Sequence, residues 1–218
     1  MTFQDGVVSG GTKTSSFADL VDAAYHARVP LSATGFYATP KIHYDRHTLS
    51  GRPFFYYAYG AACAEVAIDT LTGEHRLLAV DILHDVGRSL NPAIDRGQIE
   101  GGFLQGWGWL AMEELWWNDK GELKTHAPST YKIPTSRDWP AKVRVDLWPD
   151  ENREATIHRS KAVGEPPLML ALAGFHALRD AVSSLSGYRY AAALDAPATD
   201  ERILWAVEDM RRRAEQAA

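Results

Sequence analysis

One carboxylate, Glu165, lies in a sequence context that could support acid–base chemistry. In the stretch SKAVGEPPLMLALAGFHALRDAV, residues 160–182, it follows Gly164 and precedes two prolines. Glycine allows a backbone or a ligand to approach closely, and proline suits the first turn of a helix, where its missing N–H would be unpaired anyway. The pattern therefore predicts a carboxylate at the start of a helix. An acid that serves only the helix dipole remains an alternative interpretation.

The residues after Glu165 predict a buried helix that supports this carboxylate. Large apolar side chains recur at helical spacing, and small ones fill the faces between them. A helix that is apolar nearly all round is a buried helix. We therefore expect Glu165 at the edge of the protein interior, with a short strand at 155–159 leading the chain to it. The recurring apolar residues are Leu168, Leu172, Phe175, Leu178 and Val182.

A second candidate site lies on a glycine-rich helix predicted at residues 92–115. Asn91 suits its N-cap and Pro92 its first position. Each interior glycine costs about 1 kcal/mol relative to alanine, so the glycines that follow need a packing or binding reason. Gln98 shares one side of this helix with several of them, which suits either close helix packing or the approach of a flat polar cofactor. The residues on this side are Gln98, Gly101, Gly102, Gln105 and Gly108.

The remaining pattern predicts a mixed α+β fold with antiparallel strand pairing. Two strands joined by a glycine-bearing turn are expected within 53–87, and the proline-broken segment 122–148 predicts an edge strand and ordered loop. Further helices are expected to begin at Ser16 and near Thr199. The valine pair close to the N-terminus is expected to join a sheet that lies mostly elsewhere. Cys63 is expected to be a small buried apolar residue.

Composition predicts a single globular domain over residues 1–218. The chain is 45% hydrophobic and 23% charged, which allows a substantial core. Its net charge of −5, without a basic patch, argues against a nucleic-acid partner, and no apolar run reaches the roughly 18 residues that span a membrane. No signal-peptide pattern is present, so the cytoplasm is the expected compartment. The lone Cys63 excludes a four-cysteine iron–sulfur cluster within this chain, and no spacing of His and Cys predicts a metal ligand.

Several long strings, in order along the chain, carry a resemblance to a known family. They are LSATGFY, YGAACAEVAIDTLTG, DVGRSLNPAIDRGQIEGGFLQGWG, PSTYKIP and SKAVGEPPLMLA. The chain resembles the C-terminal part of the molybdenum-binding subunit or domain of xanthine dehydrogenase, within the xanthine oxidase/aldehyde oxidase family. The resemblance implies the C-terminal portion of the molybdopterin-binding fold, and it suggests that the chain is a fragment of a longer unit.

The resemblance also implies site residues. The glutamate of the family's GEPP motif, its general base, falls on Glu165. The glutamine of the GQIEGG motif, whose amide is directed at the molybdenum site, falls on Gln98. The backbone of Val163 and Gly164 would border the molybdenum-pterin cofactor (molybdopterin). In this family the pterin's own sulfur atoms hold the metal, so no protein metal ligand is expected.

The implied activity is the oxidative hydroxylation of purines, from hypoxanthine or xanthine to urate. Electrons would leave through iron–sulfur and FAD centres, which are expected only on partner chains or domains. The expected partners are therefore an upstream molybdenum-domain segment and an iron–sulfur/FAD subunit, in a hetero-oligomer. Two alternatives stay open. One is a non-catalytic structural module that acts only in assembly, and the other is an aldehyde oxidase-type hydroxylase.

Overall fold

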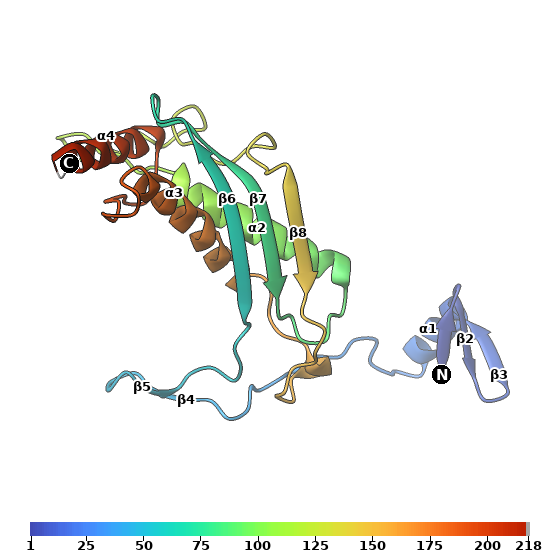
Figure 1. The fold of residues 1–218 in the computed structure, drawn as a ribbon. Helices are drawn as coiled ribbons and strands as arrows, with labels where there is room; N and C mark the ends of the chain where they lie inside the picture. The colour runs from blue at the N-terminus through green and yellow to red at the C-terminus, as the bar shows by residue number, and fades with distance from the viewer. Residues whose placement is uncertain (217–218) are drawn as a thin grey trace. The chain divides into compact units, whose positions relative to one another are not determined.

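The computed structural model describes residues 1–216 and divides into two compact units, residues 1–55 and the chain from residue 56 onward (Figure 1). Each unit has its own strands and helices. The prediction of a single domain over residues 1–218 stays a prediction. None of the helices within residues 1–216 is both long and apolar enough to cross a membrane.

The first unit begins with a three-stranded antiparallel sheet in the order β1-β2-β3. The strands are β1 (Thr2–Gln4), β2 (Val7–Gly10) and β3 (Lys13–Ser16). The valine pair therefore lies in the middle strand of a local sheet and does not join a sheet elsewhere, because the glycine turns on either side let the chain pair with itself.

A short helix, α1 (Phe17–His26), follows this sheet. The Ser16 side chain accepts a hydrogen bond of 3.0 Å from the amide of Asp19, which confirms the predicted helix start. An extended segment then leads to a small antiparallel hairpin of β4 (His43–Asp45) and β5 (Ser50–Arg52).

The second unit is built on a three-stranded sheet in the order β6-β7-β8. The strands β6 (Gly60–Ile68) and β7 (His75–His84) form the predicted antiparallel hairpin. The strand β8 (Lys142–Leu147) is an edge strand, as expected, but it pairs with β7 in the parallel sense. The expectation of purely antiparallel pairing was wrong. The helix α2 (Pro92–Ala111) lies between β7 and β8 in the chain, and this long connection brings the chain back to the end of the sheet where β7 begins, so that β8 runs in the same direction as β7.

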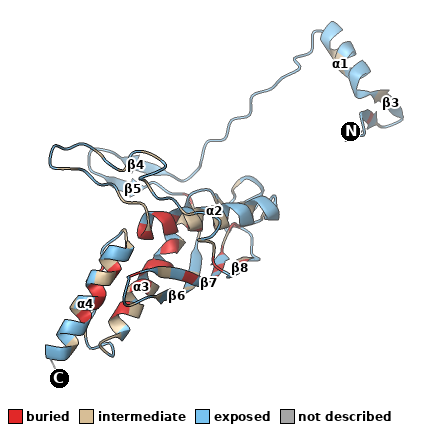
Figure 2. Cartoon of the chain, turned by 90° about the horizontal axis from the view of Figure 1, so that it is seen from above, coloured by how far each residue is buried: buried red, intermediate tan, exposed pale blue. Residues whose placement is uncertain are grey.

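Helices cover one face of this sheet. The helices α2 (Pro92–Ala111) and α3 (Leu172–Ser184) pack on the same side, and α4 (Asp200–Gln216) packs against α3 (Figure 1). Figure 2 shows that buried residues concentrate on these helices and on the strands beneath them. Large buried members of the core are Val80, Ile99, Phe103, Leu178, Val182, Ile203 and Met210.

Two local expectations were wrong, and one expected helix begins in a tighter form. The segment expected as a strand at 155–159 contains a short 3-10 helix, η1 (Ile157–Arg159), with a positive φ of 52° at His158. The helix expected after Glu165 does begin at the two prolines, but its first part is a 3-10 helix, η2 (Pro166–Ala171), which leads into α3. Cys63 is exposed, because successive strand residues face opposite sides and the helices cover only one side of β6.

Candidate functional site

The structure brings Gln98 on α2 next to the turn that carries Glu165. A Cβ atom built on Gly164 would lie 3.9 Å from Gln98 Oε1 and would meet no other group within 4 Å. Val163 is half-buried, whereas Gln98, Gly164 and Glu165 are exposed. The Glu165 side chain is thus more exposed than the expected position at the edge of the interior, although Val163 before it packs against the core and Pro167 after it is buried.

The polar ends of the Gln98 and Glu165 side chains are free to bind a ligand. Within residues 1–216, neither the Gln98 amide nor the Glu165 carboxylate takes part in a hydrogen bond or an ion pair. A glycine without a side chain, an exposed carboxylate and an unpaired amide together form a surface that a flat polar ligand can approach. A pterin cofactor fits this chemistry.

The glycines of α2 divide between two faces. A Cβ on Gly102 would lie 3.0 Å from Pro167 Cβ, and one on Gly106 would lie 2.8 Å from Ala171 Cβ and collide with the Leu168 carbonyl oxygen. These two glycines therefore let η2 pack directly on the α2 backbone, which fixes the helix turn after Glu165.

Gly101 belongs to the other face. A Cβ there would meet nothing within 4 Å, and Gln98 and Gln105 are exposed beside it. The sequence predicted that Gly101 and Gly102 lie on one side of the helix and are both closely approached. This prediction was wrong, because residues one position apart are separated by about 100° around a helix. Packing explains one face, and the open face remains free for a ligand or another chain segment.

The segments that precede α2 and the Glu165 turn are hydrogen-bonded to each other. The Arg88 amide donates to the Arg159 carbonyl at 2.9 Å, and the Lys161 amide donates to the Val86 carbonyl at 2.8 Å. Gly87 lies between these bonds with φ at +61°, and a Cβ there would lie 2.5 Å from the Arg159 carbonyl oxygen, so only glycine fits. The segments that lead to Gln98 and Glu165 are thus joined by backbone hydrogen bonds.

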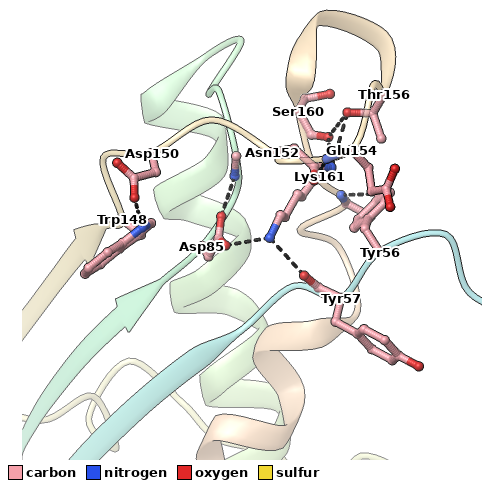
Figure 3. Close-up of polar contacts among 12 residues, drawn as sticks. Tyr56, Tyr57, Asp85, Trp148, Asp150, Asn152, Glu154, Thr156, Ser160 and Lys161 are labelled. Carbon is pink, nitrogen blue, oxygen red and sulfur yellow. Dashed lines mark hydrogen bonds and ion pairs between the residues drawn. The ribbon is translucent and has the colours of Figure 1, made fainter.

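A nearly buried ion pair reinforces this connection (Figure 3). Lys161 Nζ lies 2.5 Å from Asp85 Oδ2 and donates to the Tyr57 carbonyl oxygen at 2.9 Å. The Lys161 and Asp85 side chains are only 8% and 18% exposed. Asp85 Oδ1 also accepts a bond of 2.8 Å from the Gly87 amide, and the Ala162 amide donates to the Tyr56 hydroxyl at 2.8 Å.

The loop before Lys161 is closed by its own polar contacts, drawn in Figure 3. The buried Asn152 donates from its side chain to the Ser160 carbonyl at 3.3 Å and accepts from the Glu154 amide at 3.0 Å. The Thr156 hydroxyl donates to the same Ser160 carbonyl at 2.7 Å. These contacts hold two residues with positive φ, His158 and Arg159, in place.

A buried histidine lies on the helix-covered side of the sheet near this region. His84 is 1% exposed, and within residues 1–216 neither of its ring nitrogens has a hydrogen-bond partner. Burial lowers the pKa of His84 below its ordinary value; the backbone of Tyr59, close by but outside hydrogen-bond geometry, and Asp85 oppose this only in part. His84 is therefore a neutral core residue.

Two clefts open elsewhere on the second unit, and neither is lined by the predicted site residues. One, of about 540 Å³, borders the Asp85–Lys161 pair. The other, of about 870 Å³, contains His75, whose Nδ1 lies 3.0 Å from Asp200 Oδ1 and whose ring packs edge-on against Trp107. Burial lowers the pKa of His75, and Asp200 opposes the shift. Both linings carry acids and bases together, so neither favours one charge of ligand.

The described residues do not supply a metal site of their own. Within residues 1–216, no three His, Cys, Asp or Glu side chains lie close enough together to hold a metal ion.

Comparisons with known proteins identify the family. A sequence profile described as Molybdopterin cofactor-binding domain matches residues 1–140. The chain is 50% identical over 196 residues to xanthine dehydrogenase/oxidase of Felis catus, which covers 87% of this chain and 15% of that protein. The chain therefore belongs to the molybdopterin cofactor-binding domain family. It spans only a small part of the length of the curated relatives it matches.

Solved structures share the fold. The chain is similar to quinoline 2-oxidoreductase from Pseudomonas putida 86, with a TM-score of 0.65 and 28% identity, over 95% of this chain and 26% of that one. It is also similar to the aldehyde oxidoreductase of Desulfovibrio gigas, with a TM-score of 0.66 and 29% identity, over 86% and 20%. The predicted α+β portion of a molybdopterin-binding domain is thus confirmed.

Sequence reasoning missed the residues that anchor the site. Lys161 and Asp85 each stand within a string that carried the resemblance, SKAVGEPP and DVGRSLNP, yet they are 76 residues apart. Nothing in the sequence alone joins the two strings. The one local signal for Lys161 was its position in a largely apolar stretch four residues before Glu165, where a charged side chain needs a partner.

Proposed function

We propose that this chain forms one wall of a molybdenum-pterin site in an oxidoreductase that hydroxylates purines, converting hypoxanthine or xanthine to urate. One observation carries the proposal: Gln98 lies beside Gly164, and the Gln98 amide and the Glu165 carboxylate have no partner within residues 1–216. An amide beside a glycine, with a carboxylate on the next residue, offers a bound ligand a small number of polar groups on helical supports.

The chemistry assigns a separate role to each residue. Hydroxylation of a purine carbon by water yields the hydroxylated purine, two electrons and two protons. The bound molybdenum cofactor would supply the oxygen-transfer centre and accept the two electrons. Glu165 accepts one proton at a carboxylate oxygen as the general base. Gln98 orients the cofactor through its amide, and the backbone of Val163 and Gly164 leaves room for the pterin.

The remainder of the enzyme must come from other segments or chains. Glu165 is exposed here, so another segment has to cover it and exclude water. Iron–sulfur and FAD centres on partner domains or subunits would carry the electrons away, which gives a hetero-oligomer or a longer multidomain protein. The absence of a cysteine pair in this chain suits a cytoplasmic location.

Two other functions remain candidates. The exposure of Glu165 favours a non-catalytic structural module that acts only in assembly. The likeness to an aldehyde oxidoreductase favours an aldehyde oxidase-type hydroxylase.

The test is to produce this chain together with the missing molybdenum-domain segment and the iron–sulfur/FAD partner, and to measure molybdenum content and turnover. Xanthine, hypoxanthine, an aromatic aldehyde and quinoline form the substrate panel. The proposal expects bound molybdenum and urate formation from the two purines. Bound molybdenum with turnover of the aldehyde alone would favour the aldehyde oxidase type. An intact assembly without molybdenum would favour the structural module.

A further inference from the structure

We infer that Lys161 is a positioning residue for the turn that carries Glu165. This inference rests on the proposed function of Glu165, because it concerns how that carboxylate is held. Lys161 is four residues before Glu165, and its ammonium group joins chain segments that are far apart in sequence.

Several segments of the chain meet at the Lys161 ammonium group. Lys161 Nζ contacts Asp85 Oδ2 at the end of β7 and the Tyr57 carbonyl before β6. It also lies 5.5 Å from the centre of the Tyr59 ring, within range of a cation–π contact. Asp85 in turn accepts a hydrogen bond from the Gly87 amide, in the segment that leads into α2.

The ion pair of Lys161 and Asp85 is nearly buried. The Lys161 side chain is 8% exposed, so its attraction to Asp85 is weakly screened by water. Removing the ammonium group would leave Asp85 nearly buried and without its cation, which favours separation of the two segments. This single ion pair therefore helps to hold the two segments in their relative positions.

The turn itself has few polar anchors besides Lys161. Within residues 1–216, Val163 and Gly164 form no hydrogen bond, and the next one is from the Leu168 amide to the Glu165 carbonyl at 3.1 Å. The polar anchors of the turn are therefore Lys161 and Ala162, and its apolar anchors are Val163 against the core and Pro167 on Gly102. Since Lys161 provides the charged contact nearest to Glu165 on this side of the turn, its loss is expected to displace Glu165.

Amide hydrogen exchange on this chain tests the positioning without any cofactor. The reporters are the hydrogen-bonded amides of Arg88, Lys161 and Ala162. In Lys161→Met, these amides are expected to exchange at least about 10-fold faster, while α4 amides keep their rates. If Lys161→Met does not fold, the double variant Asp85→Asn/Lys161→Met removes the unpaired charge and takes its place. Unchanged exchange of the three amides in the folded variant would overturn the inference.

The matched control is Arg202→Met. Arg202 Nη2 lies 3.0 Å from Glu114 Oε1 and joins α4 to the segment after α2, with side chains 34% and 37% exposed. This variant is expected to speed exchange near the start of α4 and to leave the three reporter amides unchanged. Equal loosening of the reporters in both variants would mean that any lost ion pair has the same effect, and the inference would fail.

The kinetics of the completed enzyme distinguish a positioning role of Lys161 from a general effect on stability. Misplacement of a catalytic group by about 1 Å can reduce turnover about 100-fold. In Lys161→Met, kcat per bound molybdenum is expected to fall about 10- to 100-fold with KM changed less than about 2-fold, and Lys161→Arg is expected to recover part of the loss. Full activity in Lys161→Met beside an inactive Glu165→Gln would refute the positioning role alone. An active Glu165→Gln would refute the proposed function, while hydrogen exchange would still decide the role of Lys161.

Discussion

The close packing of η2 on α2 makes a specific prediction for Gly106→Ala. The new methyl group would lie 2.8 Å from Ala171 Cβ and would collide with the Leu168 carbonyl oxygen, which belongs to the backbone and cannot rotate away. Overpacking costs about 1–3 kcal/mol, and this geometry favours the upper end. The helix preference of alanine offsets about 1 kcal/mol of that cost. We therefore expect a loss of about 2 kcal/mol, or about 4–8 °C in Tm for a chain of this size.

Gly101→Ala is the matched control in the same helix. A methyl group at Gly101 meets no atom within 4 Å, so this variant is expected to keep or gain stability, by up to about 1 kcal/mol. Urea-induced unfolding of both variants, followed by tryptophan fluorescence, gives the comparison. If Gly106→Ala is as stable as Gly101→Ala, η2 does not pack on α2 as described.

Two further predictions concern pH and cofactor content. Burial lowers the pKa of His75 and His84 from an ordinary value of 6.5, so the unfolded chain binds more protons between the lowered and ordinary values, and the free energy of unfolding should fall as the pH is lowered from 7 to 5. Urea titrations at several pH values should show this fall, and His84→Met should make it shallower; an equal slope in both would contradict the assignment. The isolated chain should bind little or no molybdopterin, since it provides one wall only, and near-stoichiometric molybdenum after purification from a host that makes the cofactor would contradict this.

The sequence predicted the main elements of the second unit because their signals are local. Asn91 and Pro92 begin a helix at the expected place, and the turn around Gly73 joins two strands. The parallel pairing of β8 could not be predicted, because strand direction depends on where a long connection returns. The same limit applied to Cys63, whose exposure depends on which side of the sheet the helices cover.

For the candidate site as well, the sequence indicated some features and only the structure revealed the others. Family resemblance indicated Glu165 and Gln98, and the structure places Gln98 beside the glycine that precedes Glu165. The anchoring contacts came from three-dimensional pairing alone. Lys161 and Asp85 meet across 76 residues of sequence, and no periodicity within either segment indicates that contact.

The most direct test of the proposed catalytic role is turnover per bound molybdenum in the completed assembly, compared among the parent, Glu165→Gln and Gln98→Ala. Glu165→Gln keeps the size of the side chain but removes its basic oxygen, so we predict that turnover is abolished while molybdenum content and fold remain nearly intact. Gln98→Ala should lose less, because water can partly replace an orienting amide. If Glu165→Gln keeps most of the parent's turnover per molybdenum, Glu165 is only an acid at a helix start and the account of the base is wrong.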